Sequence, residues 1–246
     1  MNLRLPFLAA LMACAALATS AAGLFGVTDI VASGKVANEK RTASGFSGIR
    51  LAVPGTVVLR QAEAESVSIE ADDNLLPEIA TVVEDNSLAI RFKRPLIVKG
   101  HPTIRLLVTG PRFDSLAISG GGEIITEALK SHALSISIAG SGEVKIARLD
   151  ADALTAAIAG SGAVKAAGRA DKLTLKIAGS GDMVAGSLAA KRAKVSISGS
   201  GDATLRVSET LKVSIAGSGD VRYYGDPVVK RSLSGNGSVK RLGPAT

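Results

Sequence analysis

A short motif, in which an apolar and a small residue precede Gly-x-Gly, recurs along the second half of this chain, as in "IAGSG" at 138–142. Its seven copies are separated by 20, 20, 19, 20, 18 and 18 residues. A repeat of nearly fixed period constrains the fold strongly, because each copy must form the same structural unit. The glycine pairs are Gly120 and Gly122, Gly140 and Gly142, Gly160 and Gly162, Gly179 and Gly181, Gly199 and Gly201, Gly217 and Gly219, and Gly235 and Gly237.

Apolar residues alternate with small or polar ones on both sides of each glycine pair, as in Leu134, Ile136 and Ile138 before a pair and Val144 and Ile146 after one. A period of two predicts strands with one buried face. Helical repeats need about 33 to 47 residues and propeller blades about 40, whereas a rung of a β-helix closes in about 20. We therefore predict an all-β fold, a single-stranded parallel β-helix with rungs of 18–20 residues, right-handed by the usual preference of parallel crossovers.

The Gly-x-Gly motifs are predicted to form corners between two sheets. Glycine reaches positive φ without a Cβ clash, and a side chain at a corner would collide with the same corner of the next rung. The glycines should therefore lie in a file along the helix axis.

An acidic residue follows the corner in five of the seven repeats. One interpretation is a calcium-binding ladder, but calcium-binding β-rolls use a nine-residue repeat. The favoured interpretation is charge pairing on one strand face with the cations two residues later. The acids are Glu123, Glu143, Asp182, Asp202 and Asp220, and the cations are Lys145, Lys165, Arg222 and Lys240.

Residues 1–22 have the pattern of a secretory signal peptide, with one arginine, an apolar run and small residues before a predicted cleavage after Ala22. Lipidation of Cys14 is an alternative that we do not favour, because the residues after it are still apolar. Cys14 is the only cysteine, so a chain cleaved after Ala22 has no disulfide and no thiol nucleophile. We expect an exported protein of the periplasm or outer cell envelope.

The remainder is predicted to be one β-helical domain at 45–246, preceded by a flexible leader or early edge strand at 23–44. Within it, 45–112 should form N-terminal rungs and a cap, and 113–240 the regular rungs. The segment "DDNLLPEI" at 72–79 could form one helical turn capped by Asp72 or Asp73.

The order of motifs from Gly45 to Val239 resembles the bacterial family of putative auto-transporter adhesins with a head GIN domain. The features that carry the resemblance are Phe46 and Ile49 in "GFSGI", "EADDNLLPEI" at 70–79, Leu88 and Ile90 in one strand, and the serial corners. The resemblance implies a secreted or envelope-located β-helical domain, often tethered as a lipoprotein, with no established activity.

The chain is basic, with a formal net charge of +7. Such a surface favours anionic partners such as lipopolysaccharide, lipid head groups or other acidic polymers. The partner is otherwise unspecified by the sequence, although nucleic acid is not expected, because an exported protein rarely meets it and no aromatic platform is interleaved with the basic residues.

No pattern in the sequence indicates catalysis or a cofactor. The two histidines, His101 and His132, lie in separate segments that we predict to be a loop and a rung turn. Polysaccharide-acting enzymes also use β-helices, but the uniform rungs after Gly120 leave no long insertion to build a cleft. An enzyme is therefore the remotest of the hypotheses.

Two non-enzymatic functions remain, a surface or periplasmic binding module, such as an adhesin, and a scaffold that self-assembles like bactofilins. In "VVKRSLSG" at 228–235, Arg231 occupies a predicted inward position where the helix ends. A charge there discourages the addition of further strands. This favours the binding module.

Overall fold

The computed structural model describes residues 28–245. The predicted signal peptide with Cys14, and residues 23–27 of the predicted leader, lie outside this range. Within it, no helix is long and apolar enough to cross a membrane.

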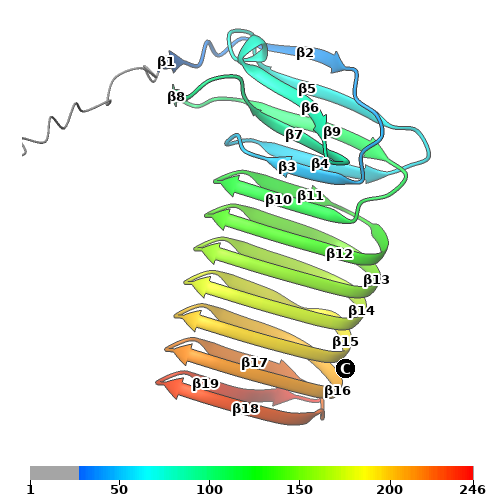
Figure 1. Ribbon diagram of the computed structural model, residues 1–246, viewed down its shortest axis with the longest axis vertical. Helices are drawn as coiled ribbons and strands as arrows, with labels where there is room; N and C mark the ends of the chain where they lie inside the picture. The colour runs from blue at the N-terminus through cyan, green and yellow to red at the C-terminus, as the bar shows by residue number, and fades with distance from the viewer. Residues whose placement is uncertain (1–27, 246) are drawn as a thin grey trace, which may run out of the picture.

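The regular part of the chain is a β-solenoid whose parallel coils stack along one axis (Figure 1). Each long strand begins after one corner, bends around the core and ends at the next corner, so that one strand makes almost one rung. The predicted parallel β-helix is confirmed. Its strands are β10 (Ser115–Gly120), β11 (Glu123–Thr126), β12 (Leu129–Gly140), β13 (Glu143–Gly160), β14 (Ala163–Gly179), β15 (Asp182–Gly199), β16 (Asp202–Gly217), β17 (Asp220–Tyr224), β18 (Val228–Gly235) and β19 (Ser238–Gly243).

The first glycines of the corners lie in one file, because each pairs in register with its equivalent in the next rung, from Gly120 to Gly235. Gly160 has φ +120°, and a Cβ built on it would lie 2.5 Å from the carbonyl oxygen of Gly140. Both the backbone conformation and the close stacking therefore require glycine, as predicted.

The core consists of stacked aliphatic side chains. One inward row runs from Ile118 through Ile138 and Ile158 to Ile215, and its members are at most 2% exposed. Because every rung presents the same row, the buried surface is continuous along the axis, and burial of such side chains contributes about 1.5–3 kcal/mol each.

The N-terminal rungs do not stack in chain order. Strands β3 (Gly48–Leu51) and β4 (Thr56–Gln61) pair with β10 and β11 on one side. On the other side they pair with β7 (Ser87–Phe92) and β9 (Ile104–Gly110). The inner rung, β3 and β4, thus comes first in the chain. The outer layer with β7 and β9 follows it, and β10 and β11 then continue the solenoid on the opposite side of the inner rung.

Antiparallel strands close the N-terminal end of the solenoid (Figure 1). Strand β5 (Ser66–Asp72) pairs with both β9 and β2 (Val36–Arg41), and β6 (Ile79–Glu84) pairs with β7. A second, two-stranded parallel sheet joins β1 (Thr28–Val31) to β8 (Leu96–Lys99). Residues 28–41 form strands because β5 and β8 each offer them an edge, so of the two interpretations of 23–44 the early edge strand, and not the flexible leader, describes them.

Asp72 does not cap a helical turn. The single turn is a 3-10 helix, η1 (Leu76–Glu78), which begins after Leu75 and has no side-chain cap. Instead, buried Asp72 accepts hydrogen bonds from the backbone N–H groups of Gly34 (2.7 Å) and Thr103 (2.8 Å). The carboxylate therefore joins two connections of the cap, which local sequence patterns do not reveal.

The C-terminal end of the solenoid is open. Strand β18 pairs with β16, and β19 pairs with β17, with no described strand on their far sides. Leu233, stacked below Ile215, is 40% exposed, and Arg231 occupies the inward position below Val213. The predicted position of Arg231 is confirmed.

Candidate binding surfaces

Four of the five acids after the corners are paired with cations, as the sequence predicted, whereas Asp182 forms no ion pair with a described cation. The Nζ of Lys145 lies 2.5 Å from Oε1 of Glu123 and 3.0 Å from Oε2 of Glu143, and the Nζ of Lys165 lies 2.7 Å from Oε1 of Glu143. Burial by itself raises the pKa of Glu143, but hydrogen bonds from Lys165 and Lys145 outweigh it, so that the pKa is lowered overall. The carboxylate of Glu143 is therefore held in its ionised form by the two lysines.

The lower part of the row is held by Arg222 and by backbone groups. The guanidinium of Arg222 lies 3.3 Å from Asp202 and 3.1 Å from Asp220. Each Asp from 182 to 220 also accepts a hydrogen bond from the backbone N–H one rung below. The hydroxyl of Ser238 lowers the pKa of Asp220, and Arg222 adds to this effect.

The row therefore has the geometry of a charge ladder along the axis. No three acidic, histidine or cysteine side chains of residues 28–245 converge as metal ligands would. Lys240, the last predicted cation, forms no ion pair with the described carboxylates. The calcium interpretation needs several oxygens around one point, and here the carboxylates of Glu123, Glu143, Asp202 and Asp220 contact Lys or Arg side chains.

A second set of charges along the bend is also balanced. Asp150 lies 2.6 Å from the Nε of Arg169, and Asp171 lies 3.0 Å from Lys191. His132 belongs to strand β12, not to the predicted turn, and its exposed ring lies 2.9 Å from Asp152. His101 is exposed in the cap, so the structure does not bring the two histidines together.

The outward face of β12–β16 and β18, by contrast, carries cations without acids. We call it the lysine face and define it by Lys172, Lys176, Lys194, Lys212 and Lys230. Lys194, Lys212 and Lys230 stack in register on successive strands. The four outward rows of this face otherwise contain Ser, Thr, Ala, Val228 and Arg192, and no Asp or Glu.

The five lysines are exposed and form no ion pair with any carboxylate of the described residues. The nearby ion pairs belong to Lys191 with Asp171 and to Arg192 with Glu209. This face therefore holds much of the excess positive charge of the molecule. A shallow groove of about 240 Å³ runs between the stems of Lys194, Lys212 and Lys230.

The lysine file was missed from the sequence, although a signal for it exists. Lys194, Lys212 and Lys230 each precede the first glycine of their corner by five residues. Aligning the repeats on the glycines would have shown the file, whereas grouping each lysine with its neighbours in the chain hides it.

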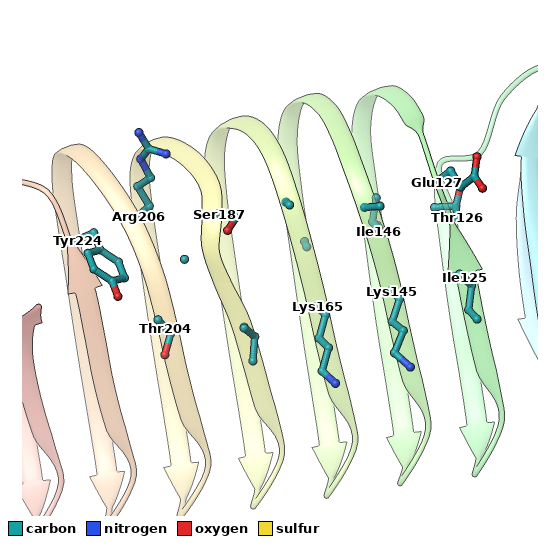
Figure 2. A pocket seen from close by; sticks show the side chains of 15 residues that line it. Ile125, Thr126, Glu127, Lys145, Ile146, Lys165, Ser187, Thr204, Arg206 and Tyr224 are labelled. Carbon is teal, nitrogen blue, oxygen red and sulfur yellow. The ribbon is translucent and has the colours of Figure 1, made fainter. Parts of the chain in front are cut away.

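A larger groove follows the bend of the solenoid on the other sheet, and we call it the axial groove (Figure 2). It has a volume of about 920 Å³ and crosses the rungs from Ile125 to Tyr224. Its sheet side carries Ile125, Lys145, Lys165, Val184 and Thr204, and its bend side carries the small residues Ala147, Ala167 and Gly186. Val184 is 49% exposed.

The rung length changes near the C-terminal end of the groove. The corner spacing falls from 20 residues before Gly199 to 18 after it. Strand β15 consequently has residues 186–188 between Ala185 and Ala189, which pair with the adjacent residues Leu205 and Arg206 of β16. The surplus forms a bulge in β15 opposite the shorter rung.

Comparison with known proteins agrees with this architecture. A solved structure from Bacteroides fragilis, a putative adhesin, has a TM-score of 0.83 and 27% identity, and covers 87% of this chain and 100% of its own. A putative lipid binding protein from Parabacteroides distasonis (TM-score 0.74, 23% identity) matches 87% of this chain and 100% of its own. A putative adhesin from Parabacteroides merdae (TM-score 0.68, 22% identity) matches 88% and 100%.

The two matches below 25% identity show the shared fold alone. No curated protein matches the chain. A family model does match, over residues 45–227, which is most of the solenoid and its cap. The chain therefore belongs to the family described as putative auto-transporter adhesin, head GIN domain.

Proposed function

We propose that this protein is an exported, non-enzymatic binding protein of the cell envelope, an adhesin that holds an anionic polymer against its lysine face. The observation that carries the proposal is the in-register file of Lys194, Lys212 and Lys230 with no acid on the same face. The signal-peptide pattern at 1–22 and membership of the adhesin family support export and adhesion.

The lysine file is electrostatically unfavourable in the isolated molecule. Strands of a sheet are about 4.8 Å apart, and two ammonium groups held at that spacing would repel each other by about 1 kcal/mol in water. On the other sheet, Lys145, Lys165 and Arg222 reduce the same kind of repulsion within the acidic row. A polymer with regularly spaced carboxylates, sulfates or phosphates would remove it here, with its chain lying along the solenoid axis.

The self-assembling scaffold is the weaker alternative. Assembly through the ends of a solenoid needs two ends that can pair, and here antiparallel strands close the N-terminal end. The open end carries Lys230, Arg231 and Lys240, none of which has an ion-pair partner among the described residues. Like charges would meet if two such ends approached.

The test is binding of a carboxylated polysaccharide, polygalacturonate, and of purified lipopolysaccharide, measured by biolayer interferometry at increasing salt. The variant Lys194→Gln/Lys212→Gln/Lys230→Gln removes the file. A lysine near an anionic surface contributes about 1 kcal/mol, so we expect about 100-fold weaker binding at low salt. Binding of the parent protein should weaken as salt rises.

The matched control is Lys35→Gln/Lys40→Gln/Lys93→Gln, which removes the same charge from exposed positions in the cap. Equal losses in the two triple variants would show that net charge, and not the lysine face, determines binding. Absence of binding to both polymers would contradict the proposal for anionic polysaccharides.

A further inference from the structure

The axial groove has one polar end and a long apolar middle. At its C-terminal end lie the guanidinium of Arg206 and the hydroxyl groups of Thr204, Ser187 and Tyr224 (Figure 2). Among residues 28–245, no carboxylate forms an ion pair with Arg206. It is thus a cation without an ion-pair partner in that range, and its side chain extends over the bend, away from the hydroxyl groups of Tyr224 and Thr204 (Figure 2).

The aromatic ring of Tyr224 lies close to the small residue of the bulge. A Cβ built on Gly186 would be 3.4 Å from Cε2 of Tyr224 and 3.4 Å from Cγ2 of Thr204. Tyr224 is two rungs below Gly186, so its ring reaches across the rung of Thr204. The ring and the glycine together form a smooth apolar surface next to Arg206.

The middle of the groove offers hydrocarbon and no free hydrogen-bond donor from its lysines. The Nζ atoms of Lys145 and Lys165 are held by Glu123 and Glu143, outside the apolar path. Their methylene stems therefore border the groove, as the stems of engaged lysines commonly do. Val184, Ala167 and Ala147 continue the apolar path toward Ile125.

The far end of the groove has the opposite charge. Glu127 is exposed there, beside Ile125. An anionic group would be repelled at this end and attracted by Arg206 at the other, so the charges define one orientation for an elongated ligand.

From this arrangement we propose that the axial groove binds a single-chain amphiphile with an anionic head group. The carboxylate or phosphate of the head accepts charge-assisted hydrogen bonds from the guanidinium of Arg206. The hydrocarbon tail lies along Gly186, Val184 and Ala167 toward Ile125. An oligosaccharide fits the site less well, because its hydroxyl groups would meet hydrocarbon along the middle of the groove.

The site is independent of the lysine face, which lies on the sheet formed by the other half of each rung. The two proposals can therefore fail separately. A protein that lacks amphiphile binding can still hold a polymer, and the reverse is also possible.

The experiment is calorimetric titration of the full chain with dodecanoate and dodecyl phosphate, each below its micelle concentration. We expect saturable binding of both, with affinity rising about two- to fourfold for each methylene added to the carboxylate series. Dodecanol should bind about tenfold more weakly, because it cannot form the charge-assisted hydrogen bonds.

Two variants locate the ligand. Arg206→Gln should weaken binding of the anionic amphiphiles about tenfold and leave binding of dodecanol unchanged. Ala167→Trp, which fills the middle of the groove, should abolish the dependence on tail length. Unchanged far-ultraviolet circular dichroism and melting temperature would establish that each variant is folded.

Lys194→Gln, on the lysine face, is the control and should leave amphiphile binding unchanged. The proposal is overturned if neither amphiphile binds saturably, or if folded Ala167→Trp binds both like the parent. Equal weakening by Lys194→Gln and Arg206→Gln would also overturn it, because the attraction would then be nonspecific.

Discussion

Glycine is required at the corners for two separable reasons, backbone conformation and stacking. Gly121 has neither positive φ nor any atom within 4 Å of a built Cβ, whereas Gly120 has φ +104° and equally open space. Gly160 has φ +120° and a Cβ position 2.5 Å from the carbonyl oxygen of Gly140. The three positions form a graded series.

We expect Gly121→Ala to change the free energy of unfolding by less than about 0.5 kcal/mol. Gly120→Ala should cost about 1–2 kcal/mol through the left-handed backbone. Gly160→Ala should cost about 3 kcal/mol or more, because overpacking adds to that strain. Urea unfolding measures all three, and equal costs at Gly120 and Gly160 would show that stacking contributes nothing.

At this scale, the sequence predicted the features present in most repeats, but it missed the file of Lys194, Lys212 and Lys230, which only three repeats share. The corner glycines and the pairing of Glu143 with Lys145 and Lys165 follow from the repeat, because each rung imposes the same neighbours on the next. Arg206 and Tyr224 could not be recognised as parts of a groove, since their position depends on the bulge at 186–188.

The cap depends on a carboxylate that joins its connections. Asp72 is 1% exposed and accepts hydrogen bonds from the backbone of Gly34 and Thr103. Asp72→Ala would leave two N–H groups without this acceptor, and a buried unsatisfied group costs about 1–3 kcal/mol. We expect a loss of about 3 kcal/mol in the free energy of unfolding, and a smaller loss for Asp72→Asn, which keeps one acceptor.

The neighbouring Asp73 provides the control. It is exposed and accepts a hydrogen bond from the hydroxyl of Ser33 at 2.6 Å. Asp73→Ala should cost less than about 0.5 kcal/mol by thermal or urea unfolding. Similar effects at both positions would mean that Asp72 does not hold the cap.

The elements of the cap show the limit of sequence patterns. The alternation in β3, β4, β7 and β9 predicts strands but not their neighbours, because pairing between distant segments leaves no local periodicity. The outer layer at 66–110 therefore could not be placed beyond the inner rung at 48–61. In the regular part the repeat itself supplies the register.

For the molecule as a whole, the two ends differ in their capacity to associate. The open end exposes the edges of β18 and β19 and the side chains of Leu233 and Leu242, with Arg231 and Lys240 among them. We expect Arg231→Val/Lys240→Ser to form dimers or larger species with rising concentration in sedimentation velocity, while the parent stays monomeric.

The control Lys35→Ser/Lys93→Val removes the same charge from the cap and should remain monomeric. Concentration-dependent association of the parent would revive the scaffold hypothesis. A monomeric Arg231→Val/Lys240→Ser variant would show that these charges are not what protects the open end.

Because one end is closed and the other is open, the length of the solenoid depends on the number of repeats between them. A further repeat inserted before β18 would leave the cap untouched and lengthen the body by one step of about 4.8 Å. If the added repeat carries a lysine at the position of Lys212, it also adds one lysine to the file. The length of the solenoid and the number of lysines in the file thus change in steps of one repeat. Duplication of a repeat can change both while the core packing of the other rungs stays the same.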